Sequence, residues 1–538
     1  MRSLWGMRAV ILSARVGPLL THRAAALVAG SLLLGCASEV APAPGGVAEV
    51  ETAPASPSAA APRSEGEVKP APGSSVGARV EVTIDPSLRW IIAGGGSLPE
   101  SNQVSIEQDL GLALRLFEGS PGLLLFAGGP GTRTVQVQRD AEELAEVEDP
   151  VAMALAELFS PRGGRGARYR PTTLPVAAEA SASSVLGALR RALAAPGAGP
   201  LFLYVAGHGD VGGAPRDNTI VLWGQSRLSV GDVAEVVDVG ARPLALVLTT
   251  CFSGGFAELA FAGAEPGQGA AKTPRCGLFA STWDLEASGC DPNPDRRAQE
   301  GYGLHFLEAL RGHDRDGVSL PTAELDLDDD GKVSLLEAHT RARIAALGIG
   351  VPTTTSERWL REVAPAGGKS VDVALPEEEA VIQALGAELG IDPAEPALAA
   401  EALAVLERGI DEHKGALLEA QLAEDRAYSA AAAELLGRWP VLDDPWHPDF
   451  ATMFQAERAA IVSHLEIDAT YRAYLDARGE VDRIQVEIGD LRGEAARYER
   501  LARAIETRAL AGRLAARGGA DWRHYAELLA CERSLPPV

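Results

Sequence analysis

Positive charge is scarce in this chain of 538 residues. Lys and Arg together number 49 against 74 Asp and Glu, which gives a formal net charge of −25 at pH 7. An acidic surface repels both the phosphates of nucleic acids and anionic lipid headgroups. We therefore expect no nucleic-acid partner and no attachment to a membrane through charge alone.

Cysteine is also rare, with five residues in the whole chain. None of them lies in a Cys-x-x-Cys motif or beside paired histidines, the patterns that are typical of zinc sites. Cys276 and Cys290 bracket a predicted strand and loop. They are close enough in sequence to form a disulfide in an oxidising compartment, and the sequence leaves both the bonded and the reduced state open.

The chain has no apolar run long enough to span a bilayer, and a shorter run lies near its amino terminus. Residues 1–35 contain four arginines and no acidic residue, the composition of an export signal. They lead into Leu33-Leu34-Gly35-Cys36, which resembles the lipobox of bacterial lipoproteins. This resemblance implies that Cys36 carries lipid and becomes the new amino terminus, whereas an ordinary cleaved signal is the alternative. Ala37 is not the Asp that marks retention in the inner membrane, so we expect a lipid anchor in the bacterial cell envelope, with the outer membrane favoured and the protein facing the periplasm or the cell surface.

Three further segments follow the signal. Residues 36–78 are rich in Ala, Pro and Ser, cannot bury a core, and are expected to form a flexible linker or a removable pro-segment. Residues 79–365 alternate short apolar runs with helical patterns, which predicts an α/β domain with a mostly parallel sheet. Residues 366–538 are dominated by Ala, Leu, Glu and Arg at helical spacing and are expected to form a helical domain.

Two apolar runs of the α/β segment end in residues that carry chemistry. Residues 201–206 lead into His208 and Gly209, and residues 243–250 lead into Cys251. Parallel strands place their carboxyl ends at one edge of the sheet, so we expect His208 and Cys251 to lie side by side. The Cys251 thiolate would attack a peptide carbonyl, His208 would protonate the leaving amine, and the N–H groups of Gly209 and Cys251 would bind the oxyanion. A predicted helix over residues 252–261 would favour the thiolate, whereas a buried structural Cys and a structural His are the alternative.

This arrangement resembles the caspase-like cysteine peptidases, a group that includes caspases, legumains, gingipains, separases and metacaspases. His-Gly after one strand faces Cys-x-Ser-Gly after the next, and residues 89–107 are similar to the first strand and substrate-side loop of the legumain type. The resemblance covers residues 80–365. It implies a caspase-like sheet flanked by helices and a cysteine endopeptidase that acts on protein or peptide substrates through a Cys-His dyad and a thioester. A non-catalytic binding scaffold and a legumain-like transamidase are the alternatives.

The resemblance also implies where a substrate binds. In this family the loop after the strand that follows the nucleophile helps to line the pocket for the residue before the cleaved bond. Asp284 and Glu286 in that loop would pair with Arg or Lys, whereas Ser281 would suit Asn. Ser97 and Asn102 are expected to border the substrate cleft. A solvated loop without substrate contacts is the alternative.

Residues 326–337 match the twelve-residue EF-hand loop at its diagnostic positions. Gly331 would make the sharp turn, and a helix is expected to follow the loop, whereas Pro321 interrupts any helix before it. We therefore expect a structural Ca²⁺, which is not needed for catalysis, with an acidic surface turn as the alternative. The expected ligands are Asp326, Asp328, Asp330, the Lys332 carbonyl, Ser334 and Glu337.

Two glycine-rich turns, residues 93–97 and 126–132, also follow predicted strands. Neither has the glycine spacing of a dinucleotide site or the Gly-Lys-Ser/Thr of a P-loop. They therefore indicate turns at strand ends rather than a nucleotide site.

Helical periodicity dominates the last third of the chain. It predicts four helices, with a fifth allowed, in an all-α bundle or antiparallel coiled coil, and a rigid loop at residues 438–448. His464 and His524 are isolated from other chemical groups in this pattern. The helices could dock on the peptidase, recruit substrates or drive self-association, and the sequence does not choose among these. The four ranges are 377–389, 397–436, 449–475 and 479–514.

Overall fold

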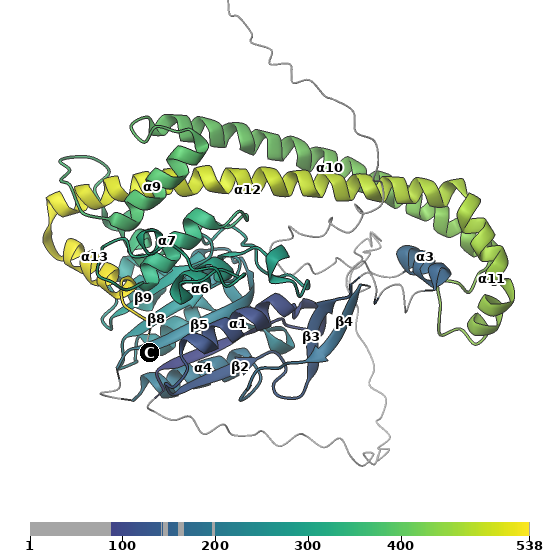
Figure 1. The fold of residues 1–538 in the computed structure, drawn as a ribbon, viewed down its shortest axis with the longest axis horizontal. Helices are drawn as coiled ribbons and strands as arrows, with labels where there is room; N and C mark the ends of the chain where they lie inside the picture. Colours follow the sequence, from purple (N-terminus) through teal and green to yellow (C-terminus); the bar gives the residue numbers. More distant parts are fainter. Residues whose placement is uncertain (1–87, 141–142, 144–148, 160–165, 196–198, 537–538) are drawn as a thin grey trace, which may run out of the picture.

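The structure is a computed structural model that describes residues 88–140, 143, 149–159, 166–195 and 199–536. The expected export signal, the lipidation site Cys36 and the linker at residues 36–78 lie outside the described residues. Figure 1 shows an α/β body from which a long helical arm projects.

A mixed sheet of eight strands, mostly parallel, forms the body, which confirms the predicted α/β class. The order along the sheet is β10-β9-β8-β5-β1-β2, with β6 and β7 extending from β5. Neighbours from β9 to β2 are parallel, and β10 is antiparallel to β9. The bounds are β1 Trp90–Gly95, β2 Gly122–Phe126, β5 Leu201–Asp210, β6 Thr219–Leu222, β7 Ser226–Ser229, β8 Leu244–Leu248, β9 Arg275–Phe279 and β10 Thr353–Thr354. A separate pair joins β3 Arg133–Gln138 to β4 Ala167–Pro171.

Helices cover both faces of the sheet because alternate strand residues point to opposite sides. Ile92 and Tyr204 belong to a buried cluster with residues of α1 Val104–Leu116, α6 Tyr302–Arg311 and α7 Leu335–Ala345. Ile91 and Leu203 belong to a second cluster with residues of α4 Ala182–Leu193 and α5 Val230–Val237. The sheet therefore has two buried faces, as its continuous apolar strands predict.

The chain around the candidate nucleophile differs from the prediction in two places. Strand β5 does not end before His208 but continues to Asp210, because residues 208–210 pair with β6. The α-helix predicted over residues 252–261 is instead a 3₁₀ helix, Ser253–Ala260. Its tight path follows from packing, since a Cβ at Gly254 would lie 2.7 Å from the Ser281 carbonyl oxygen.

The carboxy-terminal third is helical, as predicted, and begins after α8 Thr355–Val363. Helices α10 and α12 run side by side in opposite directions and form the arm, with α11 at its far end (Figure 1). The 49 residues of α12 extend over roughly 74 Å at the usual rise per residue. None of the helices in the described residues is long and apolar enough to cross a membrane. The bounds are α9 Pro376–Leu389, α10 Pro396–Arg438, α11 Phe450–Ile467, α12 Ala469–Arg517 and α13 Gly519–Glu532.

The predicted break between residues 475 and 479 is wrong. The chain breaks at Asp468, whose side chain accepts a hydrogen bond of 2.8 Å from the Tyr471 N–H and so caps α12. Gly479 lies inside α12. Helix α13, after Gly518 at φ +66°, was not among the four predicted ranges.

An additional helix, α3 Pro150–Phe159, joins the arm from the segment between β3 and β4. Its Leu155 and Leu158 belong to a buried cluster with Leu435 and Ile461 of the arm. The Tyr474 hydroxyl donates a hydrogen bond of 3.0 Å to the carbonyl of Glu157. The far end of the arm is therefore packed against a segment that comes from the α/β half of the sequence.

Cys276 forms a disulfide with Cys531, so the alternative of a bond to Cys290 is wrong. Cys276 lies in β9, and Cys531 lies in α13, which packs against that strand (Figure 1). Cys290 instead lies near Gly207, with its Sγ 3.8 Å from that carbonyl oxygen. The bond links the last helix to the strand that leads into the loop over the candidate nucleophile.

Candidate active site

Strands β5 and β8 bring the two predicted catalytic residues together. They are parallel neighbours with Val205 opposite Leu248, so three residues further on His208 lies beside Cys251. The backbones are in close contact there, because a Cβ at Gly209 would lie 2.1 Å from the Cys251 carbonyl oxygen. Glycine is required at this position by the close approach. The expected placement at one edge of the sheet is confirmed.

His208 is held by the loop after β1. Its side chain is buried, and Nε2 lies 2.7 Å from the carbonyl oxygen of Ser101 and 3.1 Å from Oε1 of Gln103. Both oxygens are acceptors, so Nε2 is the donor in these two contacts. Neither Ser101 nor Gln103 was predicted as a site residue, although both lie in the loop expected on the substrate side.

Cys251 is covered by the loop that follows β9. The residue is 1% exposed, its Sγ accepts a hydrogen bond of 3.3 Å from the Ala287 N–H, and it lies 3.4 Å from the Ala287 carbonyl oxygen. A substrate carbonyl therefore reaches the thiol only after Ala287 moves. We call residues 280–290 the covering loop.

Contacts from two directions hold the covering loop in place. On the nucleophile side, the Phe252 N–H donates to the Leu285 carbonyl at 2.9 Å, and the Asn218 amide donates to the Trp283 carbonyl at 2.6 Å. On the arm side, Arg492 of α12 pairs with Glu286 at 2.6 Å. The position of the loop therefore depends partly on the helical arm.

The three predicted specificity residues of the covering loop differ in their exposure and in their hydrogen-bond partners. Asp284 is exposed and accepts a hydrogen bond of 2.9 Å from the Thr282 hydroxyl. Glu286 is half-buried and paired with Arg492, whereas Ser281 is fully buried and donates to the Glu286 carbonyl. Asp284 alone of the three faces solvent in this arrangement, and contact of any of them with a substrate stays a prediction.

The two residues expected to border the cleft lie in the loop after β1. The Ser97 hydroxyl lies 3.4 Å from that of Ser101, next to the contact with His208. Asn102 is fully buried, accepts from the Gly96 N–H at 3.0 Å and donates to the Thr134 carbonyl at 3.1 Å. Asn102 therefore braces the loop that orients His208, and its contact with a substrate stays a prediction.

The predicted calcium loop brings three carboxylates together. Side-chain oxygens of Asp326, Asp328 and Asp330 lie within 4.8 Å of one another. Gly331 takes φ +83° and its N–H donates to Asp326 at 2.9 Å, as a sharp turn at this position requires. Helix α7 begins directly after the loop at Leu335, and only a short 3₁₀ turn precedes it, as predicted.

The last two predicted calcium ligands are engaged elsewhere. The oxygens of Glu337 accept backbone hydrogen bonds from Leu327 at 2.6 Å and Ser334 at 2.7 Å. The Ser334 hydroxyl caps α7 by accepting from the Glu337 N–H at 3.2 Å. The three aspartates thus fit an oxygen-binding cation, whereas Glu337 would have to turn toward it.

Neither a comparison with known protein families nor a comparison with curated proteins finds a match for this chain.

Proposed function

We propose that this chain is a caspase-like cysteine endopeptidase. The observation that carries the proposal is the close approach of the Gly209 backbone to the Cys251 carbonyl. It occurs where the parallel neighbours β5 and β8 reach the carboxyl edge of the sheet. Chemistry in open α/β sheets concentrates at this edge. The hydrogen bond from His208 Nε2 to Ser101 adds an orienting group for the base.

The proposed reaction proceeds through an acyl-enzyme. His208 takes the thiol proton on Nδ1, and Cys251 Sγ attacks the carbonyl carbon of the substrate. The N–H groups of Gly209 and Cys251 stabilise the oxyanion, and the C–N bond breaks as His208 protonates the leaving amine. Water then hydrolyses the thioester, which releases the acid and restores the thiol. The backbone carbonyl of Ser101 stabilises the imidazolium by accepting a hydrogen bond from its Nε2–H.

Because the thiol is covered, the proposal treats this arrangement as the resting form of the enzyme. Cys251 is hydrogen-bonded to Ala287, so the covering loop has to shift before a peptide binds. The same observation favours a second candidate function, a scaffold that binds a protein segment without cutting it. In that case the thiol would stay covered in the presence of any ligand.

The proposed function includes attachment to a membrane, which is supported by the sequence alone. The lipobox-like residues 33–36 support a lipid anchor on Cys36, and residues 36–78 support a tether between membrane and enzyme.

A peptide panel tests the proposed function. The soluble form from Ala37 onward would be incubated with peptides carrying Arg, Lys, Asn or Asp before the scissile bond, with and without Ca²⁺. Cleavage after Arg or Lys is expected if Asp284 and Glu286 line the pocket, and cleavage after Asn if Ser281 does. Absence of cleavage together with absence of labelling by a thiol-reactive peptide would contradict the peptidase and favour the scaffold.

Releasing the covering loop is expected to speed access to Cys251. The substitution Arg492→Gln removes the partly exposed ion pair with Glu286. Such a pair contributes up to about 1 kcal/mol, so the rate of thiol labelling should rise roughly two- to fivefold. The matched control is Arg483→Gln on the same helix, whose partners Glu480 and Glu487 also lie on α12. Equal labelling rates for the two variants would show that the arm does not hold the loop.

Calcium is expected to stabilise the protein through the loop at residues 326–337. At a Ca²⁺ concentration about 100 times the dissociation constant, the free energy of unfolding should rise by about 2.7 kcal/mol. The exposed substitution Asp328→Asn should reduce this gain by removing one ligand. Its neighbour Asp329→Asn is the matched control, because Asp329 is not a ligand in the motif and its φ of +60° suits Asn. Denaturation curves in Ca²⁺ and in EGTA measure the gain in the free energy of unfolding. Equal gains for Asp328→Asn and Asp329→Asn would contradict Ca²⁺ binding at this loop.

A further inference from the structure

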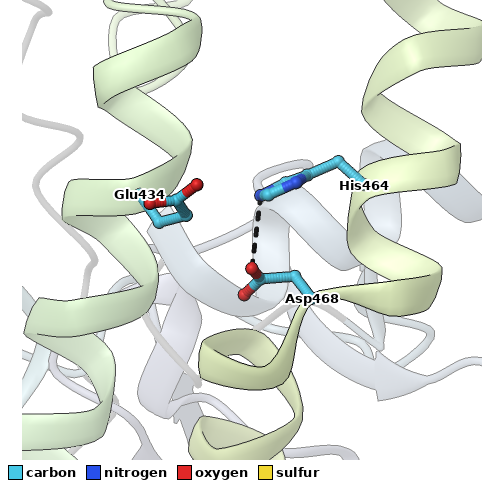
Figure 2. Close-up of side chains that lie close together, drawn as sticks. All are labelled: Glu434, His464 and Asp468. Atoms are coloured by element: carbon cyan, nitrogen blue, oxygen red, sulfur yellow. Dashed lines mark ion pairs between the residues drawn. The ribbon is translucent and has the colours of Figure 1, made fainter.

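Three helices bring a histidine and two carboxylates together at the far end of the arm (Figure 2). Glu434 comes from α10, His464 from α11, and Asp468 from the start of α12. One potential ligand atom from each lies within 4.8 Å of those of the others. His464 is therefore not isolated, which corrects the expectation from the sequence.

His464 has an unused ring nitrogen inside this cluster. The residue is 6% exposed, and Nε2 is buried without a hydrogen-bond partner among the described residues. The nearest carboxylate atom, Oδ2 of Asp468, lies 3.7 Å away, too far for a hydrogen bond. A buried nitrogen left in this state costs about 1–3 kcal/mol. A ligand that accepts its lone pair would remove this cost.

The two carboxylates are oriented by their other oxygen atoms. Arg438 donates to Oε1 of Glu434 from Nε at 3.1 Å and from Nη2 at 2.9 Å. Oδ1 of Asp468 accepts from the Tyr471 N–H at 2.8 Å and from the Thr470 hydroxyl, so that Oδ2 faces His464. Such outer hydrogen bonds are the usual means of aiming metal ligands.

The two carboxylates differ in their freedom to move. Asp468 is held in place by the hydrogen bonds from Thr470 and Tyr471. The Glu434 side chain is 42% exposed and can adjust its position. Both carboxylates thus lie beside the imidazole of His464.

We propose that Glu434, His464 and Asp468 bind a divalent transition-metal ion of the Zn²⁺ class. One imidazole nitrogen and two carboxylate oxygens suit this class, whereas Ca²⁺ and Mg²⁺ prefer oxygen ligands alone. Zn²⁺ binds imidazole nitrogens and carboxylate oxygens at about 2.0–2.2 Å. The 3.7 Å between His464 Nε2 and Asp468 Oδ2 already allows both atoms to contact one ion, so closing of the cluster onto the ion would come from movement of Glu434. The exposed Glu434 side chain permits that movement.

The ion would join the three helices at their shared end. Glu434 lies in α10, His464 in α11, and Asp468 at the junction of α11 and α12. Leu435 next to Glu434 lies in the buried cluster that also contains Leu155 and Leu158 of α3. Binding would therefore fix the tip of the arm. This site is separate from the candidate active site and independent of the proposed peptidase.

Titration with ZnCl₂ tests the site in a background that removes competing groups. The soluble form from Ala37 onward would carry Cys251→Ala. It would be freed of metal with EDTA and then dialysed into excess Ca²⁺, so that Ca²⁺ occupies the loop at residues 326–337. Calorimetry is expected to show one Zn²⁺ bound per chain. Co²⁺ in place of Zn²⁺ should give visible absorption bands that depend on His464.

Three variants make the test specific. His464→Gln and Glu434→Gln should each weaken Zn²⁺ binding at least about 100-fold, more than loss of an outer hydrogen bond does. His524→Gln should leave the affinity unchanged, although His524 also has a buried Nε2 without a hydrogen-bond partner among the described residues. Its carboxylate neighbour, Glu527 at 3.6 Å, forms no three-residue cluster with it in the described part of the chain.

Two outcomes would overturn the site. The first is that the parent protein binds no Zn²⁺ ion that raises its unfolding temperature. The second is that the parent and His464→Gln bind Zn²⁺ with equal affinity. If His464→Gln misfolds, Glu434→Gln decides the question, because its half-exposed side chain can be changed without disturbing the core, as circular dichroism would verify.

Discussion

Replacing Cys251 by Ala is expected to lower kcat/KM for peptide cleavage by at least about 10⁴-fold, because the acyl-enzyme has no other nucleophile. Replacing His208 by Ala should cause a loss of similar size, since the two side chains act as one unit. The measurement uses the peptide that the parent cleaves best. Both variants should unfold at nearly the parent's temperature, which shows that the loss is chemical.

The double variant provides the control for a shared mechanism. If Cys251 and His208 act together, removing both should cost little more than removing Cys251 alone. A double variant that loses a further 10⁴-fold would indicate two independent routes. Cleavage that survives in Cys251→Ala would place the nucleophile elsewhere and contradict the proposed function.

Removing a buried arginine is expected to cause the largest loss of stability. Arg500 of α12 is 1% exposed, and its guanidinium donates to the carbonyl of Gly350 at 2.9 and 2.6 Å. It also donates to the carbonyls of Arg343, Ala346 and Gly348. Burial lowers its pKa to about 10, so it stays charged at neutral pH. One side chain thus satisfies four backbone oxygens between α7 and β10.

Arg500→Ala should lower the free energy of unfolding by about 3–5 kcal/mol, because these carbonyls stay buried without donors. Urea denaturation followed by circular dichroism measures the loss. Arg508→Ala on the same helix is the matched control, since its ion pair with Glu379 at 2.8 Å is exposed and contributes less than about 1 kcal/mol. Similar midpoints for the two variants would show that the buried contacts do not stabilise the arm on the body.

The adjacency of His208 and Cys251 could be predicted from sequence because it depends on local patterns. Each residue follows an apolar run, and parallel neighbours share an edge. The covering loop could not be predicted, because Ala287 meets Cys251 only through packing of the chain after β9. The same holds for the Glu286 and Arg492 pair, whose partners are 206 residues apart.

Helix boundaries show a second limit of sequence reasoning. Asp468 ends α11 and caps α12, yet in a segment rich in charged residues it looks like any helical Asp. Gly479 looks like a helix breaker, but a single glycine costs only about 1 kcal/mol in a helix, and packing along the arm offsets it. Packing likewise created the cluster around His464, because it brings Glu434 of α10 to the junction of α11 and α12.

The disulfide between Cys276 and Cys531 has a consequence for synthesis of the chain. The two residues are separated by 255 positions, so at about 5–20 residues per second the Cys276 thiol waits on the order of 10–50 s for its partner. During that interval Cys251 is a competing thiol. In the folded body Cys251 is only 1% exposed. A sheet that folds before the last helix arrives would therefore shield the nucleophile from mispairing.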